Sequence, residues 1–450
     1  MSTRRPTRLT VRDDQREDEM GTDLRRRFTG PVHFPGDPAY DTLRRCLNPA
    51  VESRPAAVVE AANVADVRAA VTAVREAGVP IAVQATGHGT HDGIDDGILV
   101  RTGGMASVLV DPDRRIAKVG PGARWEAVLA AARPFGLAPL SGSSSTVGVT
   151  GYTLGGGLGW LGRAYGFAAD HVIRAEVVTA DGRSVTASAD RNPDLFWALR
   201  GGGGSFGVVT ALEFRLHPVE RVFAGAAYFP ADRAGDIFGA YRTWAAAQPD
   251  AMSSAALLRQ MPDTDDVPAP VRGRRVVVVK AMYPGEADVA RCLLHPLWSL
   301  TGPAVHDDMR SMPYAQAAMG GTAARFFDLF ESLPDRAVEA LAASDSTVEI
   351  RHWGGALGRP GEDSGPVSHR RGQFSVIVDS VEPDLIEALR PDGIGASFLN
   401  FLADPRRTAT AYTAEDLAGL RAVKAAYDPD EVFRAGHRIA PADRSRRLLA

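Results

Sequence analysis

Three clusters of glycine restrict the fold of this chain more than any other feature of its sequence. They are ATGHGTHDG (85–93), SGSSSTVGVTGYTLGGGLG (141–159) and RGGGGSFG (200–207). Glycine adopts positive φ angles and lets the backbone approach a ligand closely. Successive free N–H groups in such turns bind anions such as a pyrophosphate. One cluster could be a tight turn between strands, but three within about 120 residues favour an extended cofactor that carries phosphate groups.

The second cluster overlaps the pattern G-x-G-x-x-G, at Gly157, Gly159 and Gly162. In a Rossmann unit this pattern closes a buried apolar strand and opens a helix. Here it follows SGSSSTVGVT (141–150), which is small and polar. Asp181 has about the spacing expected of the acid that binds a ribose, but in TADG it predicts a hairpin turn. The context therefore argues against a Rossmann unit.

Composition and charge exclude several classes of protein. The 450 residues are enough for two or three domains, and an apolar content of 45% with 24% charged residues is typical of a globular protein. The net charge of -4 gives no reason to expect a nucleic acid or an anionic membrane as partner. No run of 18 apolar residues predicts a membrane span. Cys46 and Cys292 are too few for a disulfide framework or a cysteine-rich metal site.

The N-terminal segment, residues 1–27, is predicted to be a disordered tail. It contains twin arginines at Arg4 and Arg5, but a dense run of mixed charge follows where export would require an apolar segment. We therefore expect a cytoplasmic protein whose ordered part starts near Phe28.

Hydrophobic periodicity divides the rest of the chain into two parts with different patterns of strands and helices. From Arg54 short strands alternate with helices: AAVVEAA, PIAVQATG, GILVRT, RIAKVGPGA and RAEVVTADGRSVTAS predict strands, and VADVRAAVTAVREAG predicts an amphipathic helix. After Pro218 come longer strands, VFAGAAYF, MSSAALLRQM, RRVVVVKAMY, STVEIRHWG and GQFSVIVDSV, with helices such as EADVARCLLHPLWSL. This second part predicts a mainly antiparallel sheet backed by helices. The last helix, in AEDLAGLRAVKAAYDPDEVF, should end at Asp-Pro.

Four motifs give the chain a family resemblance. PIAVQATGHG (80–89) resembles the R-G-G-G-H loop of the FAD-linked oxidases whose fold is named after p-cresol methylhydroxylase and vanillyl-alcohol oxidase (PCMH/VAO), and in particular of their berberine bridge enzyme-like branch. Residues 142–172 are similar to the second flavin loop of this family, residues 192–216 to its third segment, and YDPDEVFR (427–434) to its C-terminal signature. The resemblance is strong over residues 52–218 and 395–440. Between these ranges the chain resembles the family only in its general pattern of strands and helices.

The resemblance implies an α+β fold with two domains, a PCMH/VAO-type FAD-binding domain and an antiparallel-sheet substrate domain backed by helices. We expect the FAD-binding domain over 28–219 and the substrate-binding domain over 220–395. Residues 396–450 should form a C-terminal segment that returns to the FAD domain. The glycines of 151–162 would then line the flavin, outside any Rossmann unit.

FAD is the cofactor that the resemblance implies, with His88 at the position of the histidine bonded to the flavin 8α-methyl carbon. A neutral imidazole is a suitable nucleophile for such a bond. His91 is either a loop residue that faces solvent or, with His88, half of a metal site that lacks a third ligand, so no metal is expected. The residues expected to bind FAD are Gln84, Ala85, Thr86, Gly87, His88, Gly89, Thr90, Ser143, Ser144, Thr146, Gly148, Gly151, Tyr152, Gly155, Gly157, Val208 and Asn400.

The second flavin loop departs from the pattern of members with two flavin bonds. Those members carry Cys-Pro-Thr-Val-Gly, and their cysteine is bonded to flavin C6. The matching run in this chain, residues 144–148, reads Ser-Ser-Thr-Val-Gly. Serine lacks a reactive thiolate. We therefore expect a single bond, through His88.

A second departure concerns the catalytic base. Sugar- and cannabinoid-oxidising relatives have Tyr-x-Asn-Tyr, whose last tyrosine removes a hydroxyl proton, whereas this chain has FLNFLAD with Phe398 and Phe401 at the aromatic positions. A phenyl ring accepts no proton, so the base is expected elsewhere. We rank Tyr152, next to a flavin-loop glycine, and His352, on a strand of the substrate domain, as the first candidates. Weaker candidates are Tyr314, His437 and Arg351.

The implied activity is that of an oxidase, which passes hydride from the substrate to flavin N5 and then electrons to O2, with formation of H2O2. Two alternatives stay open: a dehydrogenase with another electron acceptor, and a lyase or cyclase whose flavin has no redox role. Trp160 and Trp353 suggest an apolar or aromatic small molecule as substrate, such as a biosynthetic intermediate, although such residues are more often core. The sequence does not indicate the oligomeric state.

Overall fold

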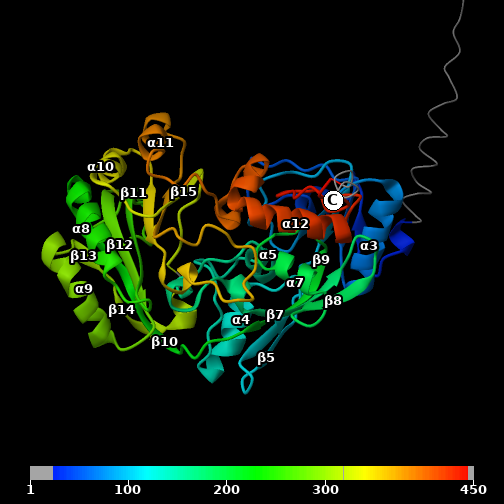
Figure 1. Ribbon diagram of the computed structural model, residues 1–450, viewed down its shortest axis with the longest axis horizontal. Helices are drawn as coiled ribbons and strands as arrows, with labels where there is room; N and C mark the ends of the chain where they lie inside the picture. Colours follow the sequence, from blue (N-terminus) through cyan, green and yellow to red (C-terminus); the bar gives the residue numbers. More distant parts are fainter. Residues whose placement is uncertain (1–23, 318, 444–450) are drawn as a thin grey trace, which may run out of the picture.

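A computed structural model describes residues 24–317 and 319–443 of the chain (Figure 1). Most of the predicted tail, 1–27, lies outside these residues. Leu24 already packs against the core of the first sheet, and Arg27 donates a hydrogen bond to Glu76 at 2.7 Å. The chain therefore contacts the rest of the protein before Phe28, where the sequence predicted the start of order. No helix in the described ranges is long and apolar enough to cross a membrane.

The first sheet has the order β1-β2-β4-β3, with β2, β4 and β3 parallel. Its strands are β1 (Val32–His33), β2 (Ala57–Glu60), β3 (Ile81–Gln84) and β4 (Ile98–Arg101). Helix α3 (Val64–Ala77) connects β2 to β3, as parallel strands require. The Asn63 side chain caps its start by accepting from Asp66 N, and Gly78 ends it with φ +70°. The strands and the helix predicted for this region are confirmed.

The second sheet is antiparallel, with the order β5-β6-β9-β7-β8. Its strands are β5 (Val108–Asp111), β6 (Ile116–Val119), β7 (Val172–Val178), β8 (Ser184–Ser188) and β9 (Val208–Arg215). Asp181 lies in the turn between β7 and β8, where it accepts from the Thr179 hydroxyl and from Arg183 N. This turn confirms the predicted hairpin. Helices α4 (Trp125–Ala132), α5 (Val149–Leu154) and α7 (Pro193–Leu199) pack against this sheet.

The third sheet contains the remaining strands, all paired antiparallel, in the order β13-β10-β12-β11-β16-β17-β15, with β14 also paired to β10. The strands are β10 (Arg221–Pro230), β11 (Ser253–Gln260), β12 (Arg275–Tyr283), β13 (His306–Asp307), β14 (Arg310–Pro313), β15 (Phe326–Phe330), β16 (Val348–His352) and β17 (Phe374–Val378). Helices α8 (Ala234–Ala246), α9 (Ala287–Thr301), α10 (Asp335–Ala343) and α11 (Pro383–Leu389) lie beside it (Figure 1).

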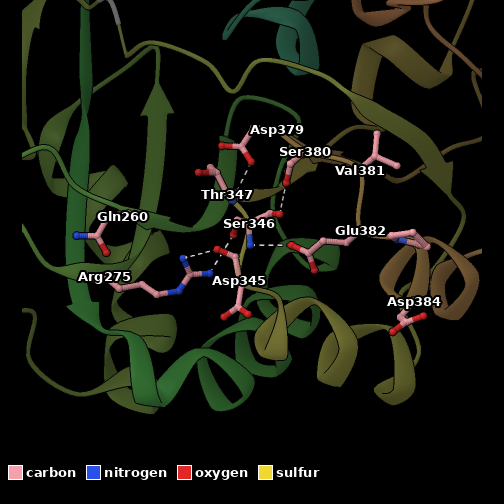
Figure 2. A pocket seen from close by; sticks show the side chains of 11 residues that line it. Gln260, Arg275, Asp345, Ser346, Thr347, Asp379, Ser380, Val381, Glu382 and Asp384 are labelled. Atoms are coloured by element: carbon pink, nitrogen blue, oxygen red, sulfur yellow. Dashed lines mark hydrogen bonds between the residues drawn. The ribbon is translucent and has the colours of Figure 1, made fainter.

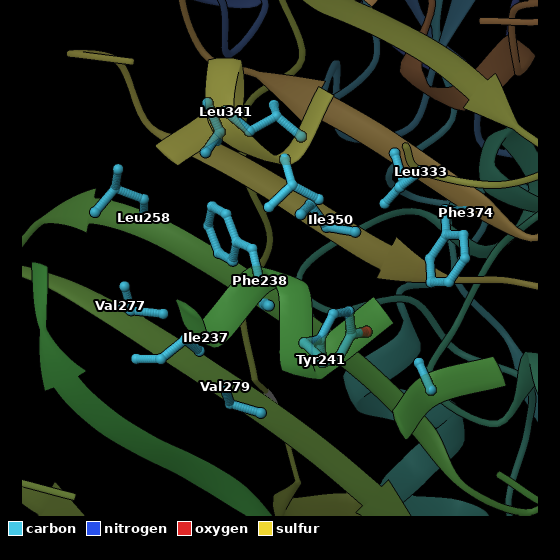
Figure 3. Close-up of a cluster of buried hydrophobic side chains, with 14 of the residues drawn as sticks. Ile237, Phe238, Tyr241, Leu258, Val277, Val279, Leu333, Leu341, Ile350 and Phe374 are labelled. Atoms are coloured by element: carbon cyan, nitrogen blue, oxygen red, sulfur yellow. The ribbon is translucent and has the colours of Figure 1, made fainter. Parts of the chain in front are cut away.

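The two faces of the third sheet pack against different parts of the molecule. On the helix-backed face, Ile237, Phe238 and Tyr241 of α8 lie over strand residues such as Val277 and Val279 (Figure 3). The opposite face packs on the first half of the chain, with Leu257, Val278 and Met282 against Leu140, Trp160 and Leu161. The predicted α+β fold and the helix-backed antiparallel sheet are confirmed. The division of the chain at residues 219 and 395 stays a prediction.

Arg163 joins the two halves. It belongs to α6 (Gly162–Tyr165), in the second glycine-rich region, and only 3% of its surface is exposed. Its guanidinium donates to Met252 O at 2.8 Å, Gln248 O at 3.2 Å and Pro249 O at 3.3 Å, and also to Trp353 O. All four carbonyls belong to the second half of the chain. One buried side chain thus fixes two segments of the third sheet to the first half of the chain.

A buried ion pair fixes the C-terminal segment. Helix α12 (Ala414–Tyr427) packs beside α7, and Lys424 at its end forms an ion pair with Asp428, both with fully buried side chains. Lys424 Nζ also donates to Ser205 O at 2.7 Å and to Phe433 O at 2.8 Å. The Asp428 carboxylate accepts from two backbone N–H groups. The pair therefore connects the C-terminal segment to the third glycine cluster.

Replacement of Lys424 should strongly destabilise the protein. In Lys424→Met the Asp428 carboxylate remains buried without its cation, which typically costs about 3–5 kcal/mol of the free energy of unfolding. The matched control is Arg336→Met, because Arg336 pairs with Asp392 at the surface and such pairs contribute up to about 1 kcal/mol. Urea unfolding midpoints measure both changes. Equal losses in the two variants would contradict this account of the buried pair.

Candidate active site

A pocket of about 700 Å³ lies where all three glycine clusters meet the C-terminal segment and the third sheet. This volume is in the usual range for ligand-binding pockets. Its walls include the loop after β3, from Gln84 to Asp92, and parts of the second and third clusters. The third sheet contributes Arg351 of β16, and the segment after α11 contributes Asn400 and Phe401.

Nearly all residues expected to bind FAD line this pocket. Those in the lining are Gln84, Ala85, Thr86, Gly87, His88, Gly89, Thr90, Ser143, Ser144, Gly148, Gly151, Tyr152, Gly155, Val208 and Asn400. Thr146 and Gly157 are not among the lining residues: the Thr146 hydroxyl hydrogen-bonds Ser144 Oγ at 2.9 Å, and Gly157 N donates to Asn400 Oδ1 at 2.8 Å. These two residues support their neighbours.

Other lining residues were not identified from the sequence. They include Thr102, Pro121, Gly321, Thr322, Ala323, Phe433, Ala435 and Gly436. The YDPDEVFR signature could have indicated Phe433, since it marks the place where the chain returns to the cofactor domain. No sequence signal indicated 321–323, because this segment of the substrate half reaches the pocket only through the tertiary fold.

Some glycines of the second cluster are required by the packing of the protein itself. A Cβ atom on Gly155 would lie 2.5 Å from Asn400 Nδ2, and one on Gly157, whose φ is +77°, would lie 2.6 Å from the Tyr152 ring. On Gly142 a Cβ would lie 2.8 Å from the same ring. These glycines therefore make room for Tyr152 and Asn400. Within the G-x-G-x-x-G pattern this explains Gly157, while a Cβ on Gly159 would lie 2.1 Å from Ser141 O.

Other glycines face open space in the pocket. Gly89, Gly151 and Gly204 line it, have no positive φ, and would carry a Cβ with no protein atom within 4 Å. Neither backbone strain nor packing within the chain requires glycine at these positions. A bulky group from outside the chain, held closely by one residue of each cluster, would explain all three. FAD fits this observation.

Asn400 fixes the second cluster. Its Oδ1 accepts from Gly157 N at 2.8 Å and its Nδ2 donates to Tyr152 O at 3.1 Å, so the side chain spans the turn after α5. Its hydrogen bond to FAD stays a prediction.

His88 and His91 of the first glycine cluster line the pocket, and so does His437 of the C-terminal segment. His88 is exposed and lines the pocket, and its backbone N–H donates to Thr86 Oγ1 at 3.4 Å. His91 lies beside His437, with ring centroids 6.5 Å apart. Burial lowers the pKa of His437 to about 4 and also lowers that of His91, so both stay neutral at pH 7. In the ranges that the structure describes, no three His, Cys, Asp or Glu side chains form a group that could hold a metal ion.

Tyr152 lines the pocket, and its hydroxyl is a polar atom that the protein does not use. Its ring packs edge-on against Trp125, with centroids 5.4 Å apart. Its hydroxyl is buried and has no hydrogen-bond partner among the described residues. Burial raises the pKa of Tyr152 well above its ordinary value of 10, so the free hydroxyl is neutral. A buried hydroxyl without a partner is a place for a substrate atom to bind.

The structure places the other candidate base, His352, away from the pocket lining. Strand alternation was expected to aim it inward, but Arg351 faces the pocket and His352 faces the helix-backed side. A shift of one residue changes the face of a strand. His352 Nε2 accepts from Arg163 Nη1 at 3.0 Å, and burial lowers its pKa to about 3. Of the weaker candidates, Arg351 and His437 line the pocket, whereas the Tyr314 hydroxyl is bound to Ser141 Oγ at 2.9 Å.

A second hollow, of about 630 Å³, lies at the ends of β16 and β17 (Figure 2). Its polar groups bind one another: Arg275 donates to the carbonyls of Ser344, Asp345 and Ser346, and Glu382 accepts from Ser344 Oγ and Ser346 N. None of the glycine clusters reaches it. We therefore assign the site to the glycine-lined pocket.

The neutral His352 should make the protein labile to acid. The unfolded chain binds a proton on this imidazole below about pH 6.5, whereas the folded protein resists protonation until pH approaches 3. Stability is therefore lost as pH falls, by about 2 kcal/mol between pH 7 and pH 5 from this group alone. His352→Gln, which keeps an acceptor for Arg163, should reduce the pH dependence of the unfolding free energy by that amount. The exposed His295→Gln should not change it, and an unchanged slope in His352→Gln would contradict the assignment.

Comparison with known proteins identifies the family. Residues 55–188 match the model of an FAD binding domain. The chain is 26% identical to the uncharacterized FAD-linked oxidoreductase YgaK of Bacillus subtilis, over 93% of this chain and 98% of that one. It is 27% identical to (R)-6-hydroxynicotine oxidase of Paenarthrobacter nicotinovorans, over 92% and 97%. The structure of wild-type BBE-like 1 from Physcomitrella patens superposes with a TM-score of 0.80 at 22% identity, over 94% and 99%.

These matches agree with the glycine-lined pocket, the helix-backed antiparallel sheet and the four motifs. The chain belongs to the FAD-linked oxidoreductases with the PCMH/VAO-type FAD-binding domain, and its fold is that of the berberine bridge enzyme-like proteins.

Proposed function

We propose that this protein is an FAD-dependent oxidase that takes hydride from a small organic substrate, with O2 as electron acceptor and H2O2 as product. FAD supplies the hydride acceptor, flavin N5. The observation that carries the proposal is the set of open glycines, Gly89, Gly151 and Gly204, around a pocket that also contains His88. The similarity to (R)-6-hydroxynicotine oxidase over almost the whole chain supports an oxidase.

His88 is the proposed attachment point of the flavin. It is exposed within the pocket lining, inside the first glycine cluster (85–93), where its imidazole is accessible to a bound group. Ser144 stands where a second, cysteine-based bond would form, and it also lines the pocket. Both observations support one covalent bond through His88.

Tyr152 is the proposed proton acceptor. Its unpartnered hydroxyl, on a residue that lines the pocket, supports this role. Because the raised pKa keeps this hydroxyl protonated at pH 7, it binds the substrate by a hydrogen bond, and it accepts the substrate proton only in the phenolate form, after its own proton has left. His352 is bound to Arg163, away from the lining, so the geometry favours Tyr152 over it. Phe401, which replaces the tyrosine of sugar-oxidising relatives, lies in the lining against Phe327 and supports an apolar or aromatic substrate of secondary metabolism. The free Cys46 and Cys292 fit a reducing compartment such as the cytoplasm.

Acid precipitation tests the flavin and its attachment. Wild-type protein should keep its yellow colour in the acid pellet, whereas His88→Ala should release the colour into the supernatant. Ser144→Ala is the matched control and should keep the colour. A colourless wild-type preparation would overturn the flavoprotein assignment, and retained colour in His88→Ala would place the bond elsewhere.

The two half-reactions test oxidase activity and the base. Enzyme photoreduced without air should be reoxidised on mixing with aerated buffer faster than free reduced FAD, whereas slow reoxidation would indicate a dehydrogenase. With an aromatic alcohol or amine that bleaches the flavin anaerobically, Tyr152→Phe should slow bleaching by about 10²-fold or more. It should leave reoxidation unchanged. Turnover of substrate without anaerobic bleaching would indicate the lyase or cyclase alternative.

A further inference from the structure

The pocket-facing side of the third sheet carries a row of charged residues that the proposed reaction does not use. Arg351 on β16 pairs with Ala255 on β11, and Ala255 pairs with Lys280 on β12. Residues paired across strands point to the same face, so Arg351 and Lys280 flank the alanine. Neighbouring strands lie about 4.8 Å apart, which puts the two Cα atoms roughly 10 Å apart. The small side chain of Ala255 therefore lies between the two cations.

Glu349 is the acidic partner of this row. It lies two residues before Arg351 and therefore on the same face, and only 1% of its surface is exposed. Its Oε1 accepts from Arg351 Nε at 2.8 Å and from Nη2 at 2.6 Å. Although burial opposes ionisation, Arg351 and Lys280 hold the pKa of Glu349 below its usual value. The row therefore contains two buried cations and one anion.

Arg351 is held in a fixed orientation at the pocket. Its guanidinium lies over the Trp160 ring, 4.9 Å from the ring centroid, and Gly321 leaves space beside Nη2. The two hydrogen bonds to Glu349 use Nε and Nη2, and Nη1 has no acceptor among the described residues. A guanidinium fixed on an aromatic face presents its remaining N–H groups in one plane, as a carboxylate requires.

Lys280 is the second cation of the row, and its own hydrogen bond is to a neutral group. Its side chain is buried and Nζ donates to Met319 O, a neutral acceptor. Burial lowers the pKa of Lys280 to about 8, so the side chain is still mostly protonated at pH 7. An anion bound beside Arg351, which lines the pocket as Lys280 does not, would be attracted by both cations.

We propose that Arg351, supported by Lys280 and oriented by Glu349 and Trp160, binds a carboxylate of the substrate, so that the enzyme selects small aromatic or apolar acids. This proposal rests on the proposed oxidase function and adds its substrate class. Arg351 acts here as a specificity-determining residue. The free Tyr152 hydroxyl, in the same pocket, would act on the part of the substrate that reacts.

Titration of the flavin-loaded protein with probes of matched shape tests the proposal. Benzoate and benzamide have the same ring and size but differ in charge, and the change in flavin absorbance gives Kd for each. Wild type should bind benzoate at least about tenfold more tightly than benzamide, a difference of about 1.4 kcal/mol. Arg351→Met should abolish the preference, and Arg371→Met, at an exposed ion pair with Glu331, should keep it.

A second variant keeps the test independent of the folding of Arg351→Met. Glu349→Gln removes the internal carboxylate that competes for Arg351 and should tighten benzoate binding severalfold, the opposite direction from Arg351→Met. Equal binding of benzoate and benzamide by wild type would overturn the proposal. A preference for benzoate that survives in Arg351→Met would also overturn it. If the reduction potential of the flavin changes in that variant, the guanidinium serves the flavin instead. A preparation without flavin would instead overturn the proposed function itself.

Discussion

The placement of the third sheet against the glycine clusters depends on Arg163. This buried arginine lies in the first half of the chain, and its guanidinium donates hydrogen bonds to four backbone carbonyls of the second half. The carbonyls are those of Gln248, Pro249, Met252 and Trp353. Carbonyls accept without competing charge, so the guanidinium is satisfied without an anion in the interface. His352 stays neutral because it is buried and because a second cation beside Arg163 would be unfavourable.

The glycine clusters serve two purposes that are mixed in sequence. Gly155 and Gly157 let Asn400 and the Tyr152 ring approach the backbone, while Gly151, between them and the second-loop serines, has no neighbour at all on its open side. Close packing of Tyr152 fixes where its hydroxyl lies, and the open glycines leave space for the cofactor beside it. The proposed catalytic group and the proposed cofactor-binding glycine therefore belong to the same short segment.

Prediction from sequence was most successful where local pattern decides structure. Three examples are the apolar runs of β2 and β4, the amphipathic repeat of α3 and the Asp-Gly turn of the β7–β8 hairpin. Each could be predicted from its own residues, because burial and turn geometry act over a few residues. The first-loop histidine and most of the expected cofactor contacts lie in one pocket, where the tertiary fold brings their separate segments together. Alternation alone did not fix which of Arg351 and His352 faces inward.

The sequence by itself determined the elements, the family and the glycine loops, because periodicity, turn chemistry and backbone freedom are properties of short segments. Only the tertiary structure decided which face of β16 meets the pocket, that His352 belongs with Arg163, and that Lys280, Glu349 and Arg351 form one row. These facts depend on strand register and on the packing of one half of the chain against the other. Both are set by contacts such as that of Arg163 with Trp353, 190 positions further along the chain, which no local pattern records.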